Sequence, residues 1–179
     1  MKKIKLFIAS SIDGYIATPN GDLEWLTEHP NPKQIDCGFN EFLSKIDTVI
    51  MGGHTYRNFL CMDIIWPYKS KKIYVISNSI LENLLNINIS FITNNVIDEI
   101  TAIKNDKGSD IALVGGGVLT KMLLQENLID EMIITTVPVL LGYGIPLFPP
   151  YYEMSNWRIY KSEIYENGLL QAFYHKAKF

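Results

Sequence analysis

The sequence is poor in several features that mark particular classes of protein. Cysteine occurs only twice in 179 residues, at Cys37 and Cys61, with the spacing of neither a disulfide framework nor a metal site. No apolar run approaches the length of a transmembrane helix. Lys5 interrupts the first apolar stretch and no small-residue cleavage site follows it, so a signal peptide is not expected. We therefore expect a cytoplasmic protein without a metal ion or a membrane partner.

Excess positive charge and internal repetition are also missing. Sixteen Lys and Arg residues face nineteen Asp and Glu residues, for a net charge of −3, and no run of like charge stands out. The electrostatic footprint of a nucleic-acid-binding protein is thus absent, and we expect no nucleic-acid partner. No repeat or linker divides the chain. Because 47% of its 179 residues are hydrophobic, the chain can form one sizeable core, and we expect residues 1–179 to be a single domain.

The most informative stretch that is present runs from Ile111 to Leu124 and reads IALVGGGVLTKMLL. An apolar run of strand length comes first, three glycines follow, and apolar residues then recur at helical spacing. Glycines let the backbone approach a ligand closely, and the helix behind them points free N–H groups forward. This pattern predicts a site for a phosphate or pyrophosphate; the alternative is a tight turn that binds nothing.

Apolar runs that suit buried strands alternate with segments of helical periodicity along the rest of the chain. The pair Asn167-Gly168 between two apolar segments is a strong hairpin signal. This order predicts an α/β fold with a mostly parallel central sheet and an antiparallel C-terminal hairpin. The expected strands are 3–9, 48–51, 72–77, 89–93, 111–114, 131–137, 157–164 and 169–177; the expected helices are 36–46, 97–104 and the segment after the three glycines, with loops around Trp25 and over 138–150.

Five motifs give the chain a resemblance to a known family. They are ASSIDGYIA, DTVIMGGHTY, VISNS, LVGGGVL and PVLLGYGIPLF, in this order from one terminus to the other. In these motifs the whole chain resembles the dihydrofolate reductase-like family, and in particular the branch of the C-terminal reductase domain of the riboflavin biosynthesis deaminase-reductase (RibD). The resemblance implies a three-layer α-β-α fold, an NADPH-dependent reductase with a small heterocyclic substrate, and a homodimer.

The resemblance also assigns residues to the cofactor, which would lie across the carboxyl ends of the strands. Small apolar groups would flank the nicotinamide, glycine turns at two helix starts would hold the pyrophosphate, and polar residues after a third strand would bind the adenosine ribose and its 2′-phosphate. These residues are Ala9, Ile16 and Ala17 at the nicotinamide; Gly52, Gly53, His54, Thr55, Gly115, Gly116, Gly117, Val118 and Leu119 at the pyrophosphate; and Ser77 and Asn78 at the ribose.

Two positions depart from the family pattern. Gly53 stands where the family usually carries Arg or Lys, and Val118 stands where some members carry another Arg. Two cationic contacts to a 2′-phosphate are therefore absent, each worth about 1.5 to 3 kcal/mol. The preference for NADPH over NADH is left open, and His54, Lys71 or Lys72 are candidates to supply part of the missing charge.

Asp36 is the predicted catalytic residue, because reduction by hydride also needs a proton from a carboxylate or from a water that the carboxylate positions. It precedes Gly52 by sixteen residues, a spacing similar to that of the substrate-binding acid in bacterial dihydrofolate reductases. Its carboxylate would also bind an N–H and an amino group of the heterocycle in bidentate fashion. The alternative is that Asp36 only caps the following helix.

The predicted substrate-binding residues are Asp13, Trp25 and Thr135 together with Asp36, and Trp66 and Tyr68 could complete an aromatic wall or simply pack. The segment 138–148 favours a ribosylaminopyrimidine-like substrate over a pterin-like one. Tyr15, however, stands where those reductases tend to carry a basic residue. The heterocycle therefore stays open, and the alternatives are dihydrofolate reductase activity or a nucleotide-binding protein that has lost catalysis.

Overall fold

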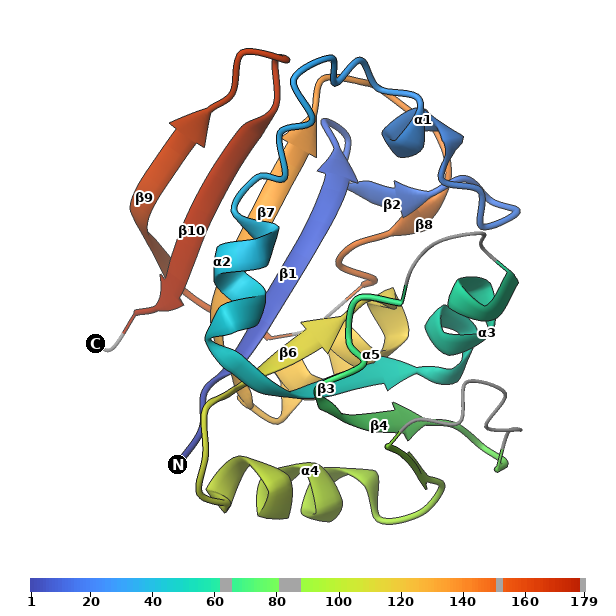
Figure 1. The fold of residues 1–179 in the computed structure, drawn as a ribbon, viewed down its shortest axis with the longest axis vertical. Helices are drawn as coiled ribbons and strands as arrows, with labels where there is room; N and C mark the ends of the chain where they lie inside the picture. Colours follow the sequence, from blue (N-terminus) through green and yellow to red (C-terminus); the bar gives the residue numbers. More distant parts are fainter. Residues whose placement is uncertain (62–65, 81–87, 151–152, 178–179) are drawn as a thin grey trace.

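The structure is a computed structural model that describes residues 1–61, 66–80, 88–150 and 153–177 (Figure 1). Strands and helices alternate along most of the chain. In order, the elements are β1 (Ile4–Ser11), β2 (Tyr15–Ala17), α1 (Glu24–Thr27), α2 (Phe39–Ser44), β3 (Ile46–Gly52), α3 (Gly53–Cys61), β4 (Lys72–Ile76), β5 (Ile89–Ile92), α4 (Val96–Asn105), β6 (Asp110–Val114), α5 (Gly117–Gln125), β7 (Ile129–Val137), β8 (Ile145–Pro146), β9 (Trp157–Ile164) and β10 (Leu170–Lys176).

One sheet of eight strands carries the fold, in the order β5-β4-β3-β6-β1-β7-β10-β9. Neighbouring strands are parallel from β5 to β7, whereas β10 is antiparallel to both β7 and β9. Asn167 and Gly168 lie in the turn that joins β9 to β10, and Gly168 has a φ of +85° that glycine tolerates. The predicted α/β class, the mostly parallel sheet and the C-terminal hairpin are confirmed.

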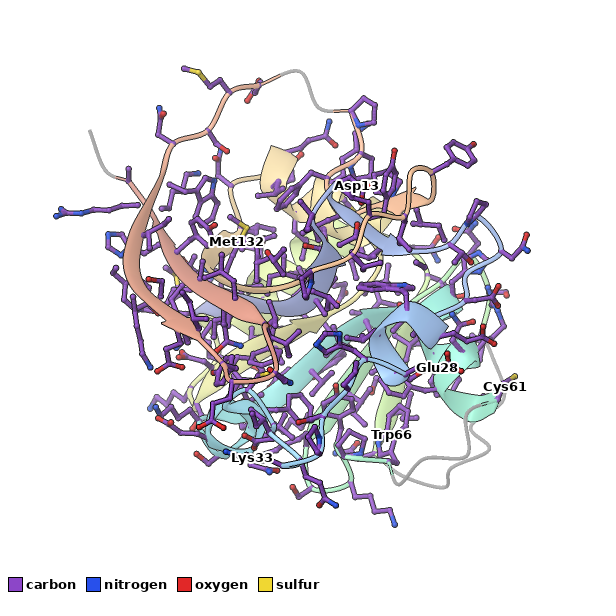
Figure 2. All side chains as sticks on the ribbon, turned by 90° about the horizontal axis from the view of Figure 1, so that it is seen from above. Asp13, Glu28, Lys33, Cys61, Trp66 and Met132 are labelled. Carbon is purple, nitrogen blue, oxygen red and sulfur yellow. The ribbon has the colours of Figure 1, made fainter. Side chains whose placement is uncertain are left out.

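Helices cover both faces of this sheet, so the three-layer arrangement is also confirmed (Figure 1). Apolar side chains of α4 and α5 pack on one face, for example Ile100 and Leu123. Phe42 of α2 and Tyr56 of α3 pack on the other. Figure 2 shows Met132 and Trp66, one from each core, on opposite sides of the sheet. The apolar runs of the central strands are explained by this burial on both faces.

The structure differs from the predicted elements at three places. The helix expected over 36–46 covers only Phe39–Ser44, because Gly38 before it has a φ of +71° and Ile46 already pairs within the sheet. Trp25 lies in the short helix α1 rather than in a loop. The loop over 138–150 contains β8, which pairs with β2. Among the described residues no helix is long and apolar enough to cross a membrane.

Candidate active site

The predicted cofactor-binding residues gather at the carboxyl ends of parallel strands. Gly53 begins α3 directly after β3, and a Cβ atom added to it would lie 3.1 Å from the Cβ and Oγ atoms of Ser77, which follows β4. Similarly, a Cβ atom added to Gly115, which follows β6, would lie 3.2 Å from the Oγ1 atom of Thr55 in α3. Three strand ends that are distant in sequence therefore form one continuous edge, where α/β sheets bind ligands.

The glycine turn before α5 needs its glycines for two separate reasons. Gly115 and Gly116 have φ values of +63° and +87°, which side chains other than glycine rarely adopt. Gly117 has an ordinary φ, but a Cβ atom there would lie 2.5 Å from the carbonyl oxygen of Pro146. No side chain caps the start of α5, and neither α3 nor α5 has an acidic residue in its first turn. Two helix starts without negative charge thus suit an anionic group.

Side chains at the start of α5 differ in exposure. Val118 is 77% exposed, which is unusual for an apolar residue next to the core, whereas Leu119 is buried. The exposed apolar side chain of Val118, beside the free N–H groups of the helix start, suits contact with a dinucleotide. Leu119, in contrast, packs in the core cluster. At the start of α3, His54 is exposed and Gly53 is buried.

The three residues predicted beside the nicotinamide have different surroundings. Ala9 is half-buried on β1, where its sheet neighbour is Thr135 of β7. Ile16 packs against the core cluster of α4 and α5. Ala17 is buried, and a Cβ atom added to Gly144 would lie 2.3 Å from its carbonyl oxygen. Close packing of β2 against the loop around β8 therefore forms one side of this region.

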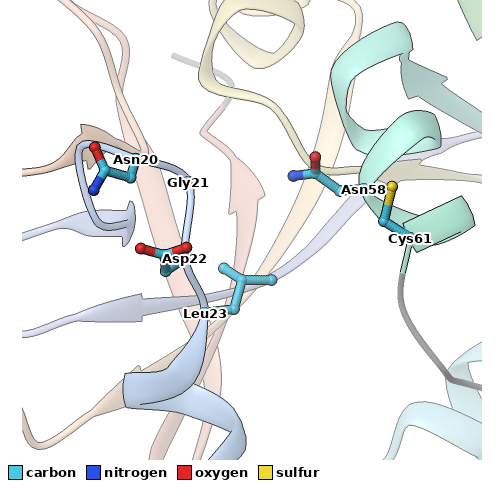
Figure 3. Close-up of a pocket in the computed structure, with 6 residues that line it drawn as sticks. All are labelled: Asn20, Gly21, Asp22, Leu23, Asn58 and Cys61. Atoms are coloured by element: carbon cyan, nitrogen blue, oxygen red, sulfur yellow. The ribbon is translucent and has the colours of Figure 1, made fainter.

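A pocket of about 280 Å³ lies between the segment after β2 and the helix α3. Asn20, Gly21, Asp22 and Leu23 line one side, and Asn58 and Cys61 line the other. Figure 3 shows the side chains of Leu23 and Asn58 pointing toward each other across it. The helix α3 thus lines this pocket with its later residues and provides Gly53 and Thr55 at its start.

Thr135 lies in a row of side chains that crosses the sheet beside this region. Register pairs Ala9 with Thr135, and Thr135 with Gln171 of β10. Thr135 is 5% exposed and Gln171 is 1% exposed. The Nε2 atom of Gln171 donates to Thr135 Oγ1 at 2.9 Å and to the carbonyl oxygen of Cys37 at 3.0 Å. This amide therefore links β7 to the segment that contains Asp36.

Asp36 caps α2. Its carboxylate accepts hydrogen bonds from the backbone N–H groups of Gly38 at 3.0 Å and Asn40 at 3.1 Å, and from Asn40 Nδ2 at 2.8 Å. The backbone bond from Asn40, followed by that from Gly38, holds the pKa of the Asp36 carboxyl below its usual range. Asp36 is thus an exposed, ionised carboxylate whose oxygens already accept local hydrogen bonds, and its catalytic role stays a prediction.

Asp13 connects the loop after β7 to the end of β1 by hydrogen bonds. Its carboxylate accepts from the hydroxyl of Ser11 at 2.6 Å and from the backbone N–H groups of Leu141 at 3.1 Å and Gly142 at 2.7 Å. The hydroxyl of Ser11 and these backbone donors lower the pKa of the Asp13 carboxyl. A structural role for Asp13 is therefore visible, while its predicted contact with substrate is untested.

The aromatic wall is only partly supported. Trp66 and Tyr68 are 7% and 3% exposed and pack edge to face with Tyr56 and Phe59, so the interpretation that they form a wall for substrate is wrong. Trp25 lies on α1, and its Nε1 atom is buried without a partner among the described residues. A buried indole N–H is costly when unpaired, so Trp25 retains the capacity to donate to a ligand.

Two of the three proposed cations lie away from the cofactor edge. Lys71 donates to the carbonyl oxygens of Leu43 and Ile46 at 2.8 and 2.7 Å, and Lys72 begins β4, at the opposite end of that strand from Ser77. The hypothesis that these lysines replace the missing charge is therefore wrong. Of the three candidates, His54 alone lies at the start of α3.

Comparison with known proteins agrees with this geometry. The model of the family "RibD C-terminal domain" matches residues 69–171. The chain belongs to this family. The uncharacterized protein YwjB of Bacillus subtilis strain 168 is 37% identical over 155 residues, which are 87% of this chain and 86% of YwjB. The RibD C-terminal family and its fold are reductase-like.

Solved structures extend the comparison. A Shewanella sp. PV-4 protein whose name assigns it to riboflavin biosynthesis has a TM-score of 0.89 and 37% identity, with 98% of this chain and 99% of that chain covered. The dihydrofolate reductase of Enterococcus faecalis, in a complex with NADP(H) and RAB-propyl, has a TM-score of 0.67 and 16% identity, with 98% and 97% covered. The second likeness shows the dihydrofolate reductase-like fold.

Gln171, the side chain that links Thr135 to the segment containing Asp36, was missed from the sequence alone. The available signal is in the segment LQAFYH, where the polar amide of Gln171 lies two residues before Phe173. On a strand, Gln171 and Phe173 face the same side, so a polar residue in an apolar row indicates a buried partner.

Proposed function

We propose that this protein is an NAD(P)H-dependent reductase of a pterin-like or ribosylaminopyrimidine-like heterocycle. The observation that carries the proposal is the convergence of two glycine helix starts, at Gly53 and Gly117, with Thr55 against Gly115 and Gly53 against Ser77. Backbone N–H groups of two helices at one edge suit a pyrophosphate, and the polar Ser77 and exposed Asn78 follow the adjacent strand. A reduced nicotinamide would supply the hydride when bound.

The residues of this chain would bind and orient the two reactants. Gly115 and Gly116 let the backbone approach the cofactor, and the small side chain of Ala9 leaves room for a flat ring at the end of β1. Thr135, next to Ala9 in the sheet, would hydrogen-bond the heterocycle. Asp13 would hold the loop over 141–142 against the same region.

The ionisation of Asp36 determines how this residue would assist the delivery of a proton to the substrate. Because its pKa is lowered, the carboxyl is ionised at neutral pH. It would therefore act by orienting the heterocycle or a water, not by donating a proton of its own. Its oxygens would exchange part of their local hydrogen bonding for donors of the substrate.

The test is a thermal-shift titration with NADPH and NADH side by side. A cofactor at a hundred times its Kd adds about 2.7 kcal/mol, which for a domain of this size is a shift of roughly 5 to 10 °C. Loss of reduced cofactor is then followed with 5-amino-6-(5-phosphoribosylamino)uracil and with dihydrofolate, and the faster of the two identifies the branch of the family whose reaction the protein performs. Absence of a shift with either cofactor contradicts the proposal.

One observation favours a second candidate, a nucleotide-binding protein without catalysis. The Asp36 carboxylate satisfies its hydrogen bonding within its own helix start, which is what a cap without a catalytic role would do. A cofactor shift without turnover of either substrate would support this candidate.

We also propose a cytoplasmic homodimer with no nucleic-acid or membrane partner. The free thiols of Cys37 and Cys61 suit a reducing compartment, and the net charge of −3 disfavours nucleic acid. The edge strand β9 exposes Ile159, Tyr160 and Ile164, which suits a second copy of the chain. Light scattering at micromolar concentration distinguishes a dimer from a monomer.

A further inference from the structure

Gln171 is a buried polar residue whose hydrogen bonds have a fixed direction. Its side chain is 1% exposed and contacts groups from three other segments, at Cys37, Thr135 and Tyr165. A carbonyl oxygen can only accept, so the amide nitrogen of Gln171 must face the carbonyl of Cys37. The same Nε2 atom then reaches Thr135, and the Oε1 atom lies 3.0 Å from the hydroxyl of Tyr165, whose one hydrogen can be donated either to Oε1 or to the Glu163 carboxylate at 2.8 Å. The amide therefore has one permitted orientation.

This orientation decides what the hydroxyl of Thr135 can do. Because Thr135 Oγ1 accepts the hydrogen of Gln171 Nε2, its own hydrogen must point elsewhere. In the part of the chain that the structure describes, the Thr135 hydroxyl donates to no other group. A hydroxyl that is 5% exposed and next to Ala9 thus keeps one hydrogen that no described group accepts.

Gln171 also fixes the segment that carries Asp36. Its second hydrogen bond ends on the carbonyl of Cys37, the residue that follows Asp36, and this bond joins positions 134 residues apart. One amide thus holds the Asp36 segment and the β7 strand relative to each other. Tyr165, which contacts Glu163 at 2.8 Å as well as Gln171, supports the amide from the hairpin side.

We propose that Gln171 is a positioning residue that commits the Thr135 hydroxyl to donate to an acceptor atom of the substrate, a carbonyl oxygen or an unprotonated ring nitrogen. The inference rests on the proposed function and adds a feature of the substrate, an acceptor facing β7. Gln171 acts through Thr135 and the Cys37 carbonyl and does not touch the reacting atoms.

The test uses two variants of nearly equal side-chain length. Gln171→Glu places acceptor atoms against Thr135, so the threonine hydroxyl turns to donate to residue 171 and is lost to the substrate. Gln171→Met removes both hydrogen bonds. We expect the Kd of 5-amino-6-(5-phosphoribosylamino)uracil for the NADP⁺-saturated protein, measured by calorimetry, to rise about tenfold or more in both variants. The Kd of NADP⁺ should change less than twofold.

A coupling measurement separates positioning from general damage. In a Thr135→Val background, Gln171→Met should weaken binding of the uracil compound less than it does in the wild-type protein, because one of the two groups through which Gln171 acts, the hydroxyl, is gone. The control is Ile100→Ala, a fully buried residue of α4 on the other face of the sheet, which should lower the melting temperature without changing the Kd of the uracil compound.

The outcomes distinguish the two proposals. Wild-type protein that binds NADP⁺ and the uracil compound, with Gln171 variants that behave like Ile100→Ala, overturns the role of Gln171 alone. Equal losses from Gln171→Met in the presence and absence of Thr135 also overturn it. Wild-type protein that binds neither NADPH nor NADP⁺ overturns the proposed function, and the inference for Gln171 falls with it.

Discussion

The two halves of the candidate site differ in the groups that form them: backbone atoms in one half and side chains in the other. At the ends of β3, β4 and β6 the cofactor edge consists of backbone and glycine, with Gly53 against Ser77 and Gly115 against Thr55. Beside these strands, on β1, β7 and β10, the region where we propose that the substrate binds consists of side chains, in the row Ala9, Thr135 and Gln171. Backbone N–H groups bind any suitably placed phosphate, whereas side chains read the particular shape and donors of one heterocycle.

The two halves should therefore tolerate substitution differently. The cofactor half depends on conformations that only glycine adopts easily, so few substitutions are compatible with it. The substrate half depends on hydrogen bonds between side chains, each of which can be exchanged for another pair. Substitutions in the two halves should therefore separate cofactor affinity from substrate turnover.

The largest effect is expected from Asp36→Asn in the substrate half. Removing the charge that would orient the heterocycle or a water should reduce turnover by about a hundredfold or more, the scale of a lost contribution to proton transfer. Stability should fall by only about 1 kcal/mol, because the amide oxygen can still accept from one of the two backbone N–H groups that the carboxylate binds, and only the other is lost. Cofactor oxidation with the uracil compound and chemical denaturation measure the two quantities.

The control for this variant is Ser44→Ala, at the other end of α2, where the hydroxyl bonds the Glu41 carbonyl. Turnover should stay near the wild-type value. If Asp36→Asn also retains full turnover, Asp36 is a cap alone and the non-catalytic interpretation of that residue holds.

Gly117→Ala tests the cofactor half. The new Cβ atom would lie 2.5 Å from the carbonyl oxygen of Pro146, so α5 or the loop around β8 must move. We expect a stability loss of about 1 to 3 kcal/mol, the scale of overpacking, together with weaker NADPH binding. Gly52→Ala is the matched control for stability, because it has an ordinary φ and no atom within 4 Å of the added methyl. Equal unfolding free energies for the two variants would show that the approach of Gly117 to Pro146 is not needed.

The sequence predicts the half formed by contiguous glycine turns better than the half formed by side chains from distant segments. The glycine turns are contiguous in sequence, so the two glycine helix starts could be predicted from LVGGGVL and MGGHTY, and the mostly parallel α/β class follows from alternating strands and helices. Gln171 and the Cys37 carbonyl are 134 residues apart, and no local pattern pairs them. For the same reason the sequence left the role of Trp66 and Tyr68 open between an aromatic wall and packing, since packing against Tyr56 and Phe59 depends on how distant segments meet.

The ion pairs of Lys3 and Lys5 with Glu131 allow a test of how stability depends on pH. Lys3 and Lys5 contact the Glu131 carboxylate at 2.7 and 3.0 Å. Burial by itself would raise the pKa of the Glu131 carboxyl, but the hydrogen bonds from both lysines outweigh it and lower the pKa. A lowered carboxyl pKa contributes stability at pH values above the ordinary value of about 4.3, and this contribution is lost as the pH falls through the lowered pKa.

Glu131→Gln should therefore reduce stability by about 1 kcal/mol at pH 7 and make the further loss between pH 5 and about pH 3 smaller than in the wild-type protein. Urea denaturation at a series of pH values gives both quantities. Turnover at pH 7 should hardly change, because Glu131 pairs with Lys5 of β1, four residues before Ala9. Parallel acid curves for the two proteins would contradict the contribution of these ion pairs.

The smallest effect concerns the choice between NADPH and NADH. His54 is exposed at the start of α3, and Lys72 lies at the other end of the neighbouring strand β4. His54→Ala should weaken NADPH about two- to fivefold, the scale of an exposed charged contact, and should leave the NADH affinity unchanged. Lys72→Ala should alter neither affinity. Because the glycine turns hold the pyrophosphate common to both cofactors, an equal loss for NADPH and NADH would place His54 at the pyrophosphate rather than at the 2′-phosphate. The discrimination would then have to come from the polar segment that begins at Ser77.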